Sequence, residues 1–280
     1  MTEPREVLTG LGVGESPRWH EDRLWFANWG AQEIVALGPG GEPEVIATAP
    51  KPVGYSIDWL PDGRLLVTGE ENLLVREPDG ALKPYADLSG LGAHWNELVV
   101  DGRGNVYVND IGFSFGAEEF RPGSIALVTP GGTVRRVAED VAFPNGMVVT
   151  PDNSTLIVAE SFAQKLTAFD IGPDGGLSRR RVWAGVGGDG ICLDADGAVW
   201  CSDMADGGAV CQRVREGGEI LDRIDLDTPC FACMLGGPDG RTLFLMVADW
   251  RGLESMGDLF AARTGRVLAV PAPAPKAGRP

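Results

Sequence analysis

The sequence predicts an all-β chain folded as one six-bladed β-propeller over residues 1–270. Three observations lead to this fold class. A phrase made of a turn and a short apolar run occurs six times, each repeat carries the signals of about four strands, and helical periodicity is almost absent. This pattern is typical of four-stranded blades set radially around a channel, whereas a β-sandwich would not explain the repeat.

The repeated phrase opens on a turn residue and continues with apolar and β-branched residues. It reads HEDRLWFANW, PDGRLLVTG, GRGNVYVND, PDNSTLIVAES, ADGAVWCSD and PDGRTLFLMVA. One turn residue of each phrase serves as its anchor, and consecutive anchors lie 40, 41, 49, 44 and 43 residues apart. This spacing is a period with insertions. The anchors are Asp22, Asp62, Arg103, Asp152, Asp196 and Asp239.

The other strands are predicted around each phrase. A short apolar run such as YSIDWL, NELVV, NGMVV or GICLD precedes the phrase, and a hairpin with a Gly-rich turn follows it, as in SIALVTPGGTVRRVA. The first apolar run, REVLTGL at 5–11, has no hairpin partner before Glu15. We therefore expect it to complete the last blade and close the ring. The segment 271–280, PAPAPKAGRP, is predicted to be a disordered tail.

Charge and hydropathy exclude several classes of partner. The chain has 24 Lys and Arg against 40 Asp and Glu, a formal net charge of −16, so phosphate backbones and anionic membranes would be repelled. No apolar run reaches the roughly 18 residues that a spanning helix needs, and the first residues lack an export signal. We expect a cytoplasmic protein that acts on a small molecule and binds neither nucleic acid nor membrane. The oligomeric state stays open.

The five cysteines predict neither a disulfide framework nor a zinc site. Their number is odd and they are scattered through the second half of the chain. Cys230 and Cys233 have the spacing of half a zinc site, but the sequence has no second such pair to complete four ligands. We expect reduced thiols.

One position in the repeat gathers oxygen-bearing side chains. Residues seven positions before the anchors should lie where the chain enters the innermost strand of each blade, at one end of the channel. Two of them are carboxylates and two are amides. The six residues are Glu15, Tyr55, Asn96, Asn145, Asp189 and Ala232.

Two carboxylates and two amides on one axis predict a metal site at the central channel. Like charges held together without compensation are costly, and hard divalent cations take such oxygen ligands. Ca²⁺ tolerates a loose, mixed ring of oxygens better than Mg²⁺, which needs near-octahedral geometry. Each residue has a simpler explanation, since Asn145 and Asp189 precede glycines in common turn dipeptides and Glu15 could lie on the surface. Their shared repeat offset favours the metal site.

The same residues lie in motifs that resemble the regucalcin, gluconolactonase and luciferin-regenerating enzyme family of six-bladed propellers. The motifs cover five of the six repeats in the right order. They are GESPRW (14–19), WNELVVDGRGNVYVND (95–110), PNGMVVTPDNSTLIVAES (144–161), GDGICLDADGAVW (188–200) and CMLGGPDGRTLF (233–244).

The resemblance implies a divalent cation, usually Ca²⁺, or another such as Zn²⁺, Mn²⁺ or Mg²⁺. Its ligands would be the matching Glu15, Asn145 and Asp189, with Asn96 at or beside the ion. The resemblance also implies lactone hydrolysis, and a related diisopropylfluorophosphatase cleaves phosphoester-type bonds on the same scaffold.

Two departures from the sugar lactonases bear on the substrate. Those relatives have an Arg two residues before the Asn and an Asp just after it, where this chain has His94 and Glu97. Losing the Arg removes a donor fork suited to sugar hydroxyls or carboxylates. With Trp95, Tyr55 and Phe115 predicted at the same mouth, the substrate pocket should be more aromatic than a sugar site. The predicted substrate contacts are Asn96, His94, Glu97, Tyr55, Trp95 and Phe115. Alternatively, Phe113 and Phe115 cover apolar blade edges.

We therefore interpret the chain as a metal-dependent hydrolase of lactones or related esters. The ion would polarise the carbonyl group, and Asp189 would act as base, as nucleophile or as the group that orients water. A serine hydrolase fits poorly because the chain has only two histidines, one of them in a turn. The alternatives are a phosphotriesterase-like hydrolase using the same site and a metal-binding propeller without turnover.

Overall fold

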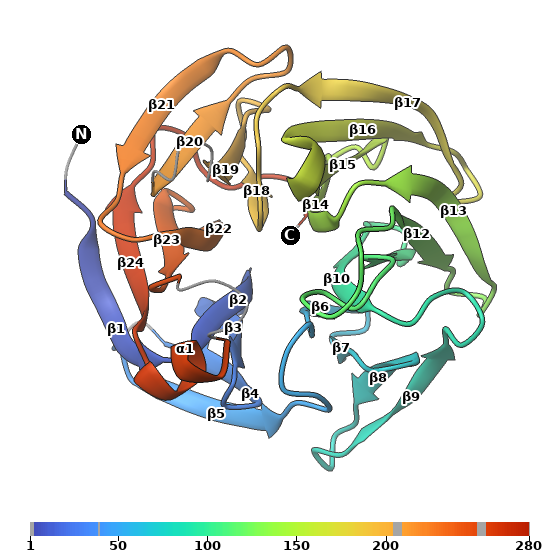
Figure 1. The fold of residues 1–280 in the computed structure, drawn as a ribbon, viewed down its shortest axis with the longest axis horizontal. Coiled ribbons are helices and arrows are strands. Elements are labelled where there is room, and N and C mark those ends of the chain that lie inside the picture. The colour runs from blue at the N-terminus through green and yellow to red at the C-terminus, as the bar shows by residue number, and fades with distance from the viewer. Residues whose placement is uncertain (1–2, 39, 204–208, 251–255, 280) are drawn as a thin grey trace.

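The computed structural model describes residues 3–38, 40–203, 209–250 and 256–279. Within these ranges the chain forms six four-stranded antiparallel sheets in a ring, as the repeat predicts (Figure 1). Each sheet is one blade. The strand that is named first for each blade below lies nearest the axis of the ring. The six innermost strands contact one another around the ring, which places their starts at one end of the axis and their ends at the other.

Blades 1 to 3 follow the chain in order. Blade 1 is β2 (Val13–His20), β3 (Arg23–Trp29), β4 (Glu33–Leu37) and β5 (Pro43–Thr48). Blade 2 is β6 (Ile57–Trp59), β7 (Leu65–Thr68), β8 (Asn72–Arg76) and β9 (Leu82–Asp87). Blade 3 is β10 (Trp95–Val100), β11 (Val106–Asp110), β12 (Gly123–Val128) and β13 (Val134–Val141).

Blades 4 to 6 continue the pattern, with two short helices outside the sheets. Blade 4 is β14 (Pro144–Val149), β15 (Thr155–Glu160), β16 (Lys165–Ile171) and β17 (Leu177–Ala184), and its 3₁₀ helix η1 is Ser161–Ala163. Blade 5 is β18 (Ile191–Leu193), β19 (Val199–Asp203), β20 (Val210–Val214) and β21 (Ile220–Asp225). Blade 6 is β22 (Cys230–Gly236), β23 (Thr242–Val247), β24 (Gly265–Pro271) and β1 (Arg5–Leu11), with α1 at Met256–Ala262.

The N-terminal strand closes the ring, as predicted. β1 pairs antiparallel with β24, with Arg5 opposite Ala269 and Leu11 opposite Gly265. Blade 6 is therefore built from both ends of the chain. Without this pairing, the backbone N–H and C=O groups on the outer side of β24 would have no strand partner.

The turn in the repeated phrase has a backbone reason for its sequence. The residue after the anchor has positive φ in five repeats, where it is Gly63, Gly104, Asn153, Gly197 or Gly240. Glycine and asparagine are the residues that adopt this conformation at least cost. The anchor and the Gly or Asn that follows it thus form the turn between the two innermost strands of these five blades.

The core lies between neighbouring blades. Trp19 of β2 stacks on Phe244 of β23 with ring centroids 5.7 Å apart, and His20 stacks on Trp59 of blade 2 at 4.0 Å. The five cysteines are buried thiols on blades 5 and 6, where the Sγ atoms of Cys192 and Cys233 lie 3.8 Å apart. Packing of blade against blade joins the sheets into one body.

The tail differs from its prediction. Within 271–279 the chain crosses the far ends of the innermost strands, and the C-terminus lies near the centre of the ring (Figure 1). Ala277 N donates to Leu193 O, and Arg279 and Val149 exchange two backbone hydrogen bonds of 2.9 and 2.6 Å. The Pro-rich composition gave no sign of this order, because the partners are backbone groups distant in the sequence.

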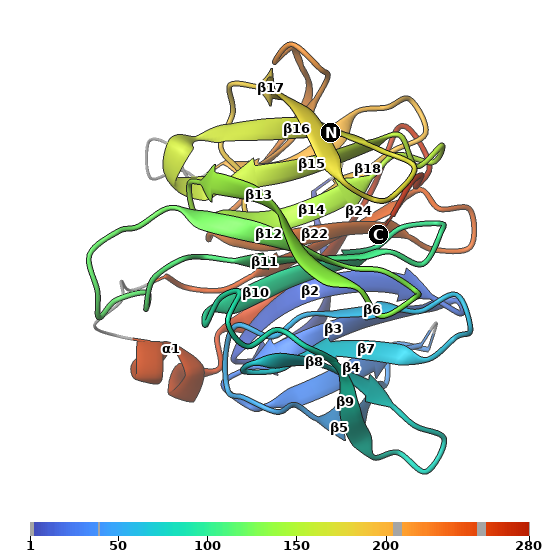
Figure 2. The same ribbon diagram turned by 90° about the vertical axis from the view of Figure 1, so that its right-hand side faces the viewer.

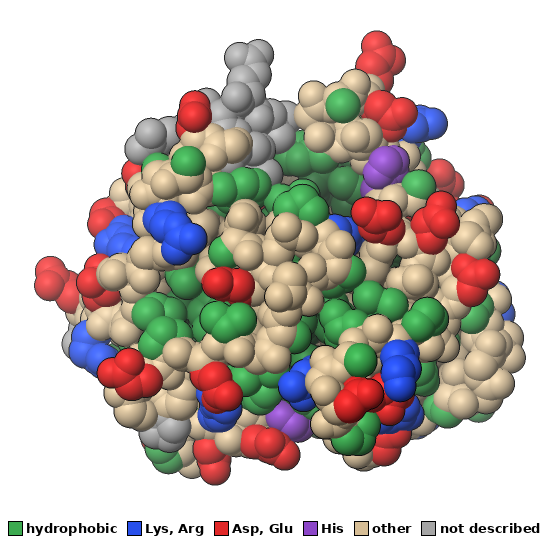
Figure 3. Space-filling view, turned by 90° about the horizontal axis from the view of Figure 1, so that it is seen from below, with side chains coloured by type: hydrophobic (Ala, Val, Ile, Leu, Met, Phe, Trp, Pro, Cys, Tyr) green, Lys and Arg blue, Asp and Glu red, His purple; other side chains and the backbone are tan. Residues whose placement is uncertain are grey.

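The two ends of the ring differ in what covers them. Figure 2 shows the ring from the side, with α1 at one end and the C-terminus at the other. On the face in Figure 3, Lys and Arg are scattered among Asp and Glu and form no basic stripe. No helix within the described ranges has the length and hydropathy to cross a membrane.

Candidate active site

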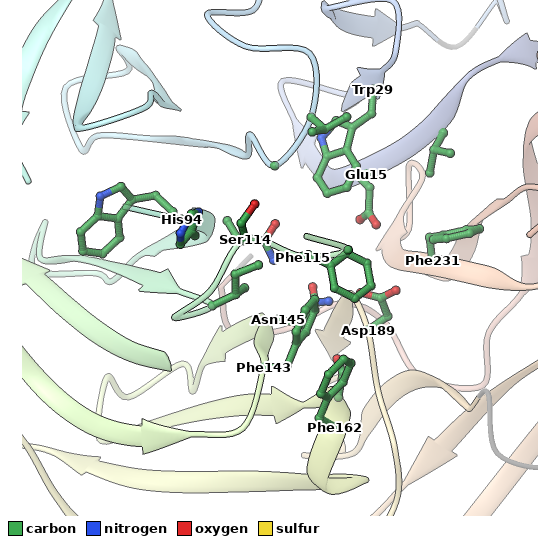
Figure 4. A pocket seen from close by; sticks show the side chains of 18 of the residues that line it. Glu15, Trp29, His94, Ser114, Phe115, Phe143, Asn145, Phe162, Asp189 and Phe231 are labelled. Carbon is green, nitrogen blue, oxygen red and sulfur yellow. The ribbon is translucent and has the colours of Figure 1, made fainter. Parts of the chain in front are cut away.

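A cavity of about 730 Å³ opens at the end of the ring where the innermost strands begin. All four predicted oxygen-bearing residues line it: Glu15 from β2, Asn96 from β10, Asn145 from β14, and Asp189 from the segment before β18. Figure 4 shows Glu15, Asn145 and Asp189 pointing toward one another from three blades. The shared repeat offset therefore corresponds to one place in space.

Irregular pairing of the innermost strands accompanies this convergence. The register shifts between Glu15 and Arg18 in β2, between Trp95 and Leu98 in β10, and between Pro144 and Met147 in β14. A bulge re-aims the side chains that it contains. Glu15 and the two asparagines stand at or within these bulges and line the cavity.

Asp189 is a partly buried carboxylate, and one of its oxygens is buried without a hydrogen bond within the described part of the chain. Its Oδ1 is inaccessible to solvent and has no hydrogen-bond partner among the described residues. Burial and, after it, the negative charge of Glu97 raise the pKa of Asp189 to about 7, while a hydrogen bond with the Asn145 side chain opposes the shift. An oxygen left unpaired at such a position indicates a missing ligand or a reactive role.

Glu15 lies beside Asp189, and its ionised form is likewise disfavoured by burial and by neighbouring negative charges. Burial raises the pKa of Glu15 well above its ordinary value, and the charges of Asp189 and Glu97 add to the shift. Two interactions lower the pKa of Glu15. The backbone N–H of Ser16 donates to Oε2 at 3.3 Å, and the positive charge of Arg18 has a smaller effect than this hydrogen bond.

Glu97 has a different place from the one predicted. It is buried, it is not part of the cavity wall, and Arg18 donates to its Oε1 at 2.7 Å. Ser16 Oγ lies 3.1 Å from the same oxygen. Asn96 lines the cavity, whereas its neighbour Glu97 points into the protein behind the cavity wall.

The charges and donors of this cluster fit a hard divalent cation. Glu15, Glu97 and Asp189 carry three negative charges when ionised and Arg18 carries one positive charge, which leaves two negative charges uncompensated. Two carboxylates and two amides line the cavity, and their side-chain oxygens are donors of the kind that Ca²⁺ prefers. Within the part of the chain that is described, no group of three His, Cys, Asp or Glu side chains forms a metal site, so the amides are needed.

The other predicted substrate contacts divide into two groups. His94, Trp95 and Phe115 line the cavity. Tyr55 does not: it is buried between blades 1 and 2, and its hydroxyl lies 2.9 Å from the carbonyl oxygen of Asn28 and 3.0 Å from that of Glu33. Ala232, at the sixth equivalent position, is also fully buried.

The cavity wall includes residues that the sequence did not single out. Most are aromatic and come from blades 1, 4 and 6 or the segments beside them, and one is a lysine. They are Trp29, Lys51, Phe143, Phe162, Phe231, Trp250 and Phe260. Phe143 could have been found from its position, since it stands two residues before Asn145. Lys51 lies in a blade-connecting segment outside the repeated phrases and had no such signal.

Lys51 gives a pH-dependent prediction. Its ammonium group donates to Trp95 O at 2.7 Å, and burial lowers its pKa to about 8, against the opposing charges of Glu70 and Asp110. Between that value and the unfolded value near 10.5, the unfolded chain binds more protons than the folded one. Stability from this residue therefore rises with pH in that window. We expect the unfolding free energy of wild type relative to Lys51→Met to increase by roughly 2 kcal/mol from pH 7 to pH 9.5.

Urea denaturation at the two pH values measures this change. Any difference between the hydrogen bonds that the ammonium and the neutral amine make to Trp95 O is already contained in the pKa, so the change with pH reports the pKa alone. Lys83, whose side chain is 57% exposed on β9, supplies the control variant Lys83→Met. A difference between wild type and Lys51→Met that does not vary with pH would contradict the assignment.

Comparison with known proteins places this geometry in a family. The model of the SMP-30/gluconolactonase/LRE-like region matches residues 13–249. Pentonolactonase XacC of Haloferax volcanii is 26% identical over 270 residues, covering 92% of this chain and 89% of that protein. Diisopropyl-fluorophosphatase of Loligo vulgaris is 26% identical over 174 residues, 55% of each chain. The calcium-binding protein regucalcin of Agrobacterium tumefaciens has the same fold, with a TM-score of 0.79, 22% identity, and coverage of 99% and 95%. This chain belongs to the SMP-30/gluconolactonase/LRE-like family.

Proposed function

We propose that the protein is a hydrolase of lactones or related esters that depends on a divalent cation, with Ca²⁺ as the ion that suits its donors best. The observation that carries the proposal is the buried, unpaired Oδ1 of Asp189 beside Glu15 on the cavity floor. Buried carboxylates of like charge need a counter-charge, and the donors are all oxygens. The match to a pentonolactonase over nearly the whole chain supports a lactone as the substrate class.

Each side chain of the floor has a part in this reaction. Glu15, Asn96, Asn145 and Asp189 would hold the ion, which when bound supplies a Lewis acid for the carbonyl oxygen of the substrate. Asn145 fixes Asp189 through their side-chain hydrogen bond. In hydrolysis, the oxygen of water bonds to the carbonyl carbon, the ring C–O bond breaks, and the ring oxygen takes up a proton to give a hydroxy acid.

Asp189 has three possible roles in these steps. It takes a proton from the attacking water, orients that water, or attacks the carbonyl carbon itself. Single-turnover hydrolysis in ¹⁸O-labelled water separates direct attack from the other two. Direct attack would open the lactone ring and form an anhydride between the acyl group and Asp189. Water that then opens this anhydride at the carbonyl carbon of Asp189 leaves an unlabelled oxygen of Asp189 in the first product, whereas attack of water on the lactone puts the label there at once.

A second candidate is hydrolysis of phosphotriesters or fluorophosphates at the same site. The observation that favours it is the match to diisopropyl-fluorophosphatase, which covers about half of this chain. A phosphoryl oxygen would occupy the place of the carbonyl oxygen. Rates on matched lactone, aryl ester and phosphotriester substrates discriminate between the two candidates.

Chelation should abolish turnover. We expect treatment with EDTA to lower kcat/KM for a hydrolysed lactone by at least about 100-fold, because the polarising charge is lost and the floor carboxylates are then uncompensated. Added Ca²⁺ should restore the rate. Activity with and without chelator, together with elemental analysis of protein purified without chelator, measures this, and we expect close to one equivalent of metal.

Metal specificity serves as the control. Re-addition of Mg²⁺ to the chelated protein should restore less activity than Ca²⁺ at equal concentration, because Mg²⁺ requires a stricter geometry. Full activity in protein shown to be free of metal would overturn the proposal. So would the absence of Ca²⁺ binding by calorimetry.

A further inference from the structure

Five phenylalanines form one cluster at the side of the cavity mouth. Phe113, Phe115 and Phe120 come from the segment between β11 and β12, Phe143 stands just before β14, and Phe162 lies in η1. Phe143 and Phe162 are stacked, with ring centroids 4.6 Å apart and planes at 13°. Phe113 is buried and lies within 6.2 Å of the other four rings, so it holds the cluster together.

Three of these rings form a wall of the cavity. Phe115, Phe143 and Phe162 line it, whereas Phe113 and Phe120 do not. The centroid of Phe115 lies 5.0 Å from that of Phe143 and 6.2 Å from that of Phe162. Figure 4 shows these three rings on the side of Asn145 and Asp189. We call Phe115, Phe143 and Phe162 the phenylalanine wall.

The phenylalanine wall leaves apolar surface open to solvent. Phe115 is 39% exposed and Phe162 is 50% exposed, although both rings already contact other aromatic rings. An open apolar surface beside a cleft marks a place where an apolar group binds. Trp29, Phe231 and Phe260 line the same cavity from other segments, so apolar side chains lie on more than one side of it.

Several polar side chains of the cavity already have partners within the protein. Lys51 donates to Trp95 O, Ser161 Oγ donates to Gly188 O, and Gln164 Nε2 donates to Ser161 O. Each has one donor committed to the protein, which leaves fewer donors free for the hydroxyls of a sugar ring. A hydroxyl buried without a partner is costly, so a polyhydroxylated ring is poorly matched to these walls.

We infer that the substrate carries an aryl or alkyl substituent that packs on the phenylalanine wall, and that Phe115 is a residue that determines this specificity. The inference rests on the proposed function, since it places the ester or lactone carbonyl over Glu15, Asn145 and Asp189. The substituent then extends from the acidic floor toward Phe115. Phe143 and Phe162 form the rest of the surface that it covers.

A series of γ-lactones with 4-alkyl chains of increasing length tests this inference. In wild type, kcat/KM should rise about two- to fourfold for each added methylene until the wall is covered, and should exceed that for glucono-δ-lactone. Phe115→Ala should lower kcat/KM for the longest chain at least tenfold more than it lowers kcat/KM for unsubstituted γ-butyrolactone. Phe162→Ala should flatten the series in the same way.

Phe120→Ala is the matched control. It removes a 48% exposed ring from the same segment and the same cluster, but from outside the cavity wall, so the dependence on chain length should persist. Thermal unfolding checks that all three variants fold. A preference for glucono-δ-lactone, or a chain-length dependence unchanged in both Phe115→Ala and Phe162→Ala, would overturn the inference.

Binding of 5-alkyl-2-pyrrolidinones, which are lactams that resist hydrolysis, separates this inference from the proposed function. If their affinity by calorimetry rises with chain length and falls in Phe115→Ala, the inference stands even where no lactone is turned over. If a chelator stops the hydrolysis of lactones but the rate does not depend on the length of their alkyl chain, the proposed function stands and the inference fails.

Discussion

Asp189→Asn is expected to lower kcat by about 1,000-fold while the protein stays folded. The amide has the shape of the carboxylate and can remain near a bound ion, but it can neither accept a proton from water nor attack a carbonyl carbon. Loss of a general base or of a nucleophile has effects of about this size. The variant also removes one of three neighbouring carboxylates, so its stability without metal should equal or exceed that of wild type.

Steady-state kinetics on the same lactone and thermal unfolding measure the two parts of this prediction. Asp196→Asn is the control, since Asp196 belongs to the same blade but lies in the turn at the far end of β18, where it pairs with Arg213 at 2.6 Å. Its kcat should match wild type within twofold. If Asp189→Asn kept a tenth of the wild-type rate or more, the reacting group would lie elsewhere, and Glu15 would be the next residue to test because Glu97 is outside the cavity wall.

The ring and the floor of the site could be predicted because both repeat along the sequence. Five of the six blades use the same turn, which needs a residue that adopts positive φ, so Gly or Asn recurs at one offset from the anchor, as at Gly63 and Asn153. The offset of seven residues then locates the start of each innermost strand. Glu15, Asn96, Asn145 and Asp189 meet in one cavity because the blades are related around an axis.

The offset gives a position along the chain, but not the direction of a side chain. Tyr55 precedes β6 and points between blades, whereas Asp189, which precedes β18 with equally regular pairing, lines the cavity. Asn96 and Glu97 lie in the bulge of β10, where the first faces the cavity and the second pairs with Arg18 behind it. No local pattern in the sequence distinguishes these strands, because a bulge depends on the partner strand as well.

Contacts between segments far apart in the chain also could not be predicted from the sequence. The ordered tail depends on backbone partners such as Val149 and Leu193, which are more than 80 residues away. The phenylalanine wall joins Phe115 of one blade to Phe143 and Phe162 of the next. Sequence alone placed Phe115 at the mouth through its blade, but the rings that complete the wall became visible only in three dimensions.

Arg18→Met should destabilise the metal-free protein by about 3–5 kcal/mol at pH 7. Arg18 is buried, and it donates to Glu97 Oε1 and Leu98 O at 2.7 Å and to Pro17 O at 3.0 Å. Its removal leaves Glu97 buried without its cation, near Glu15 and Asp189. Breaking a buried ion pair on one side has a cost of this size, because the remaining charge is uncompensated.

Urea denaturation of chelated protein measures this loss, and three comparisons identify its cause. Arg215→Met breaks the exposed pair with Glu219 and should cost at most about 1 kcal/mol. The double variant Arg18→Met/Glu97→Gln should recover part of the loss, because no unpaired charge remains. Burial already raises the pKa of Glu97, and losing Arg18 would raise it further, so folded Arg18→Met binds more protons than its unfolded chain as the pH falls toward 5. Its deficit relative to wild type should therefore shrink from pH 7 to pH 5, whereas a deficit caused by lost packing alone would stay constant.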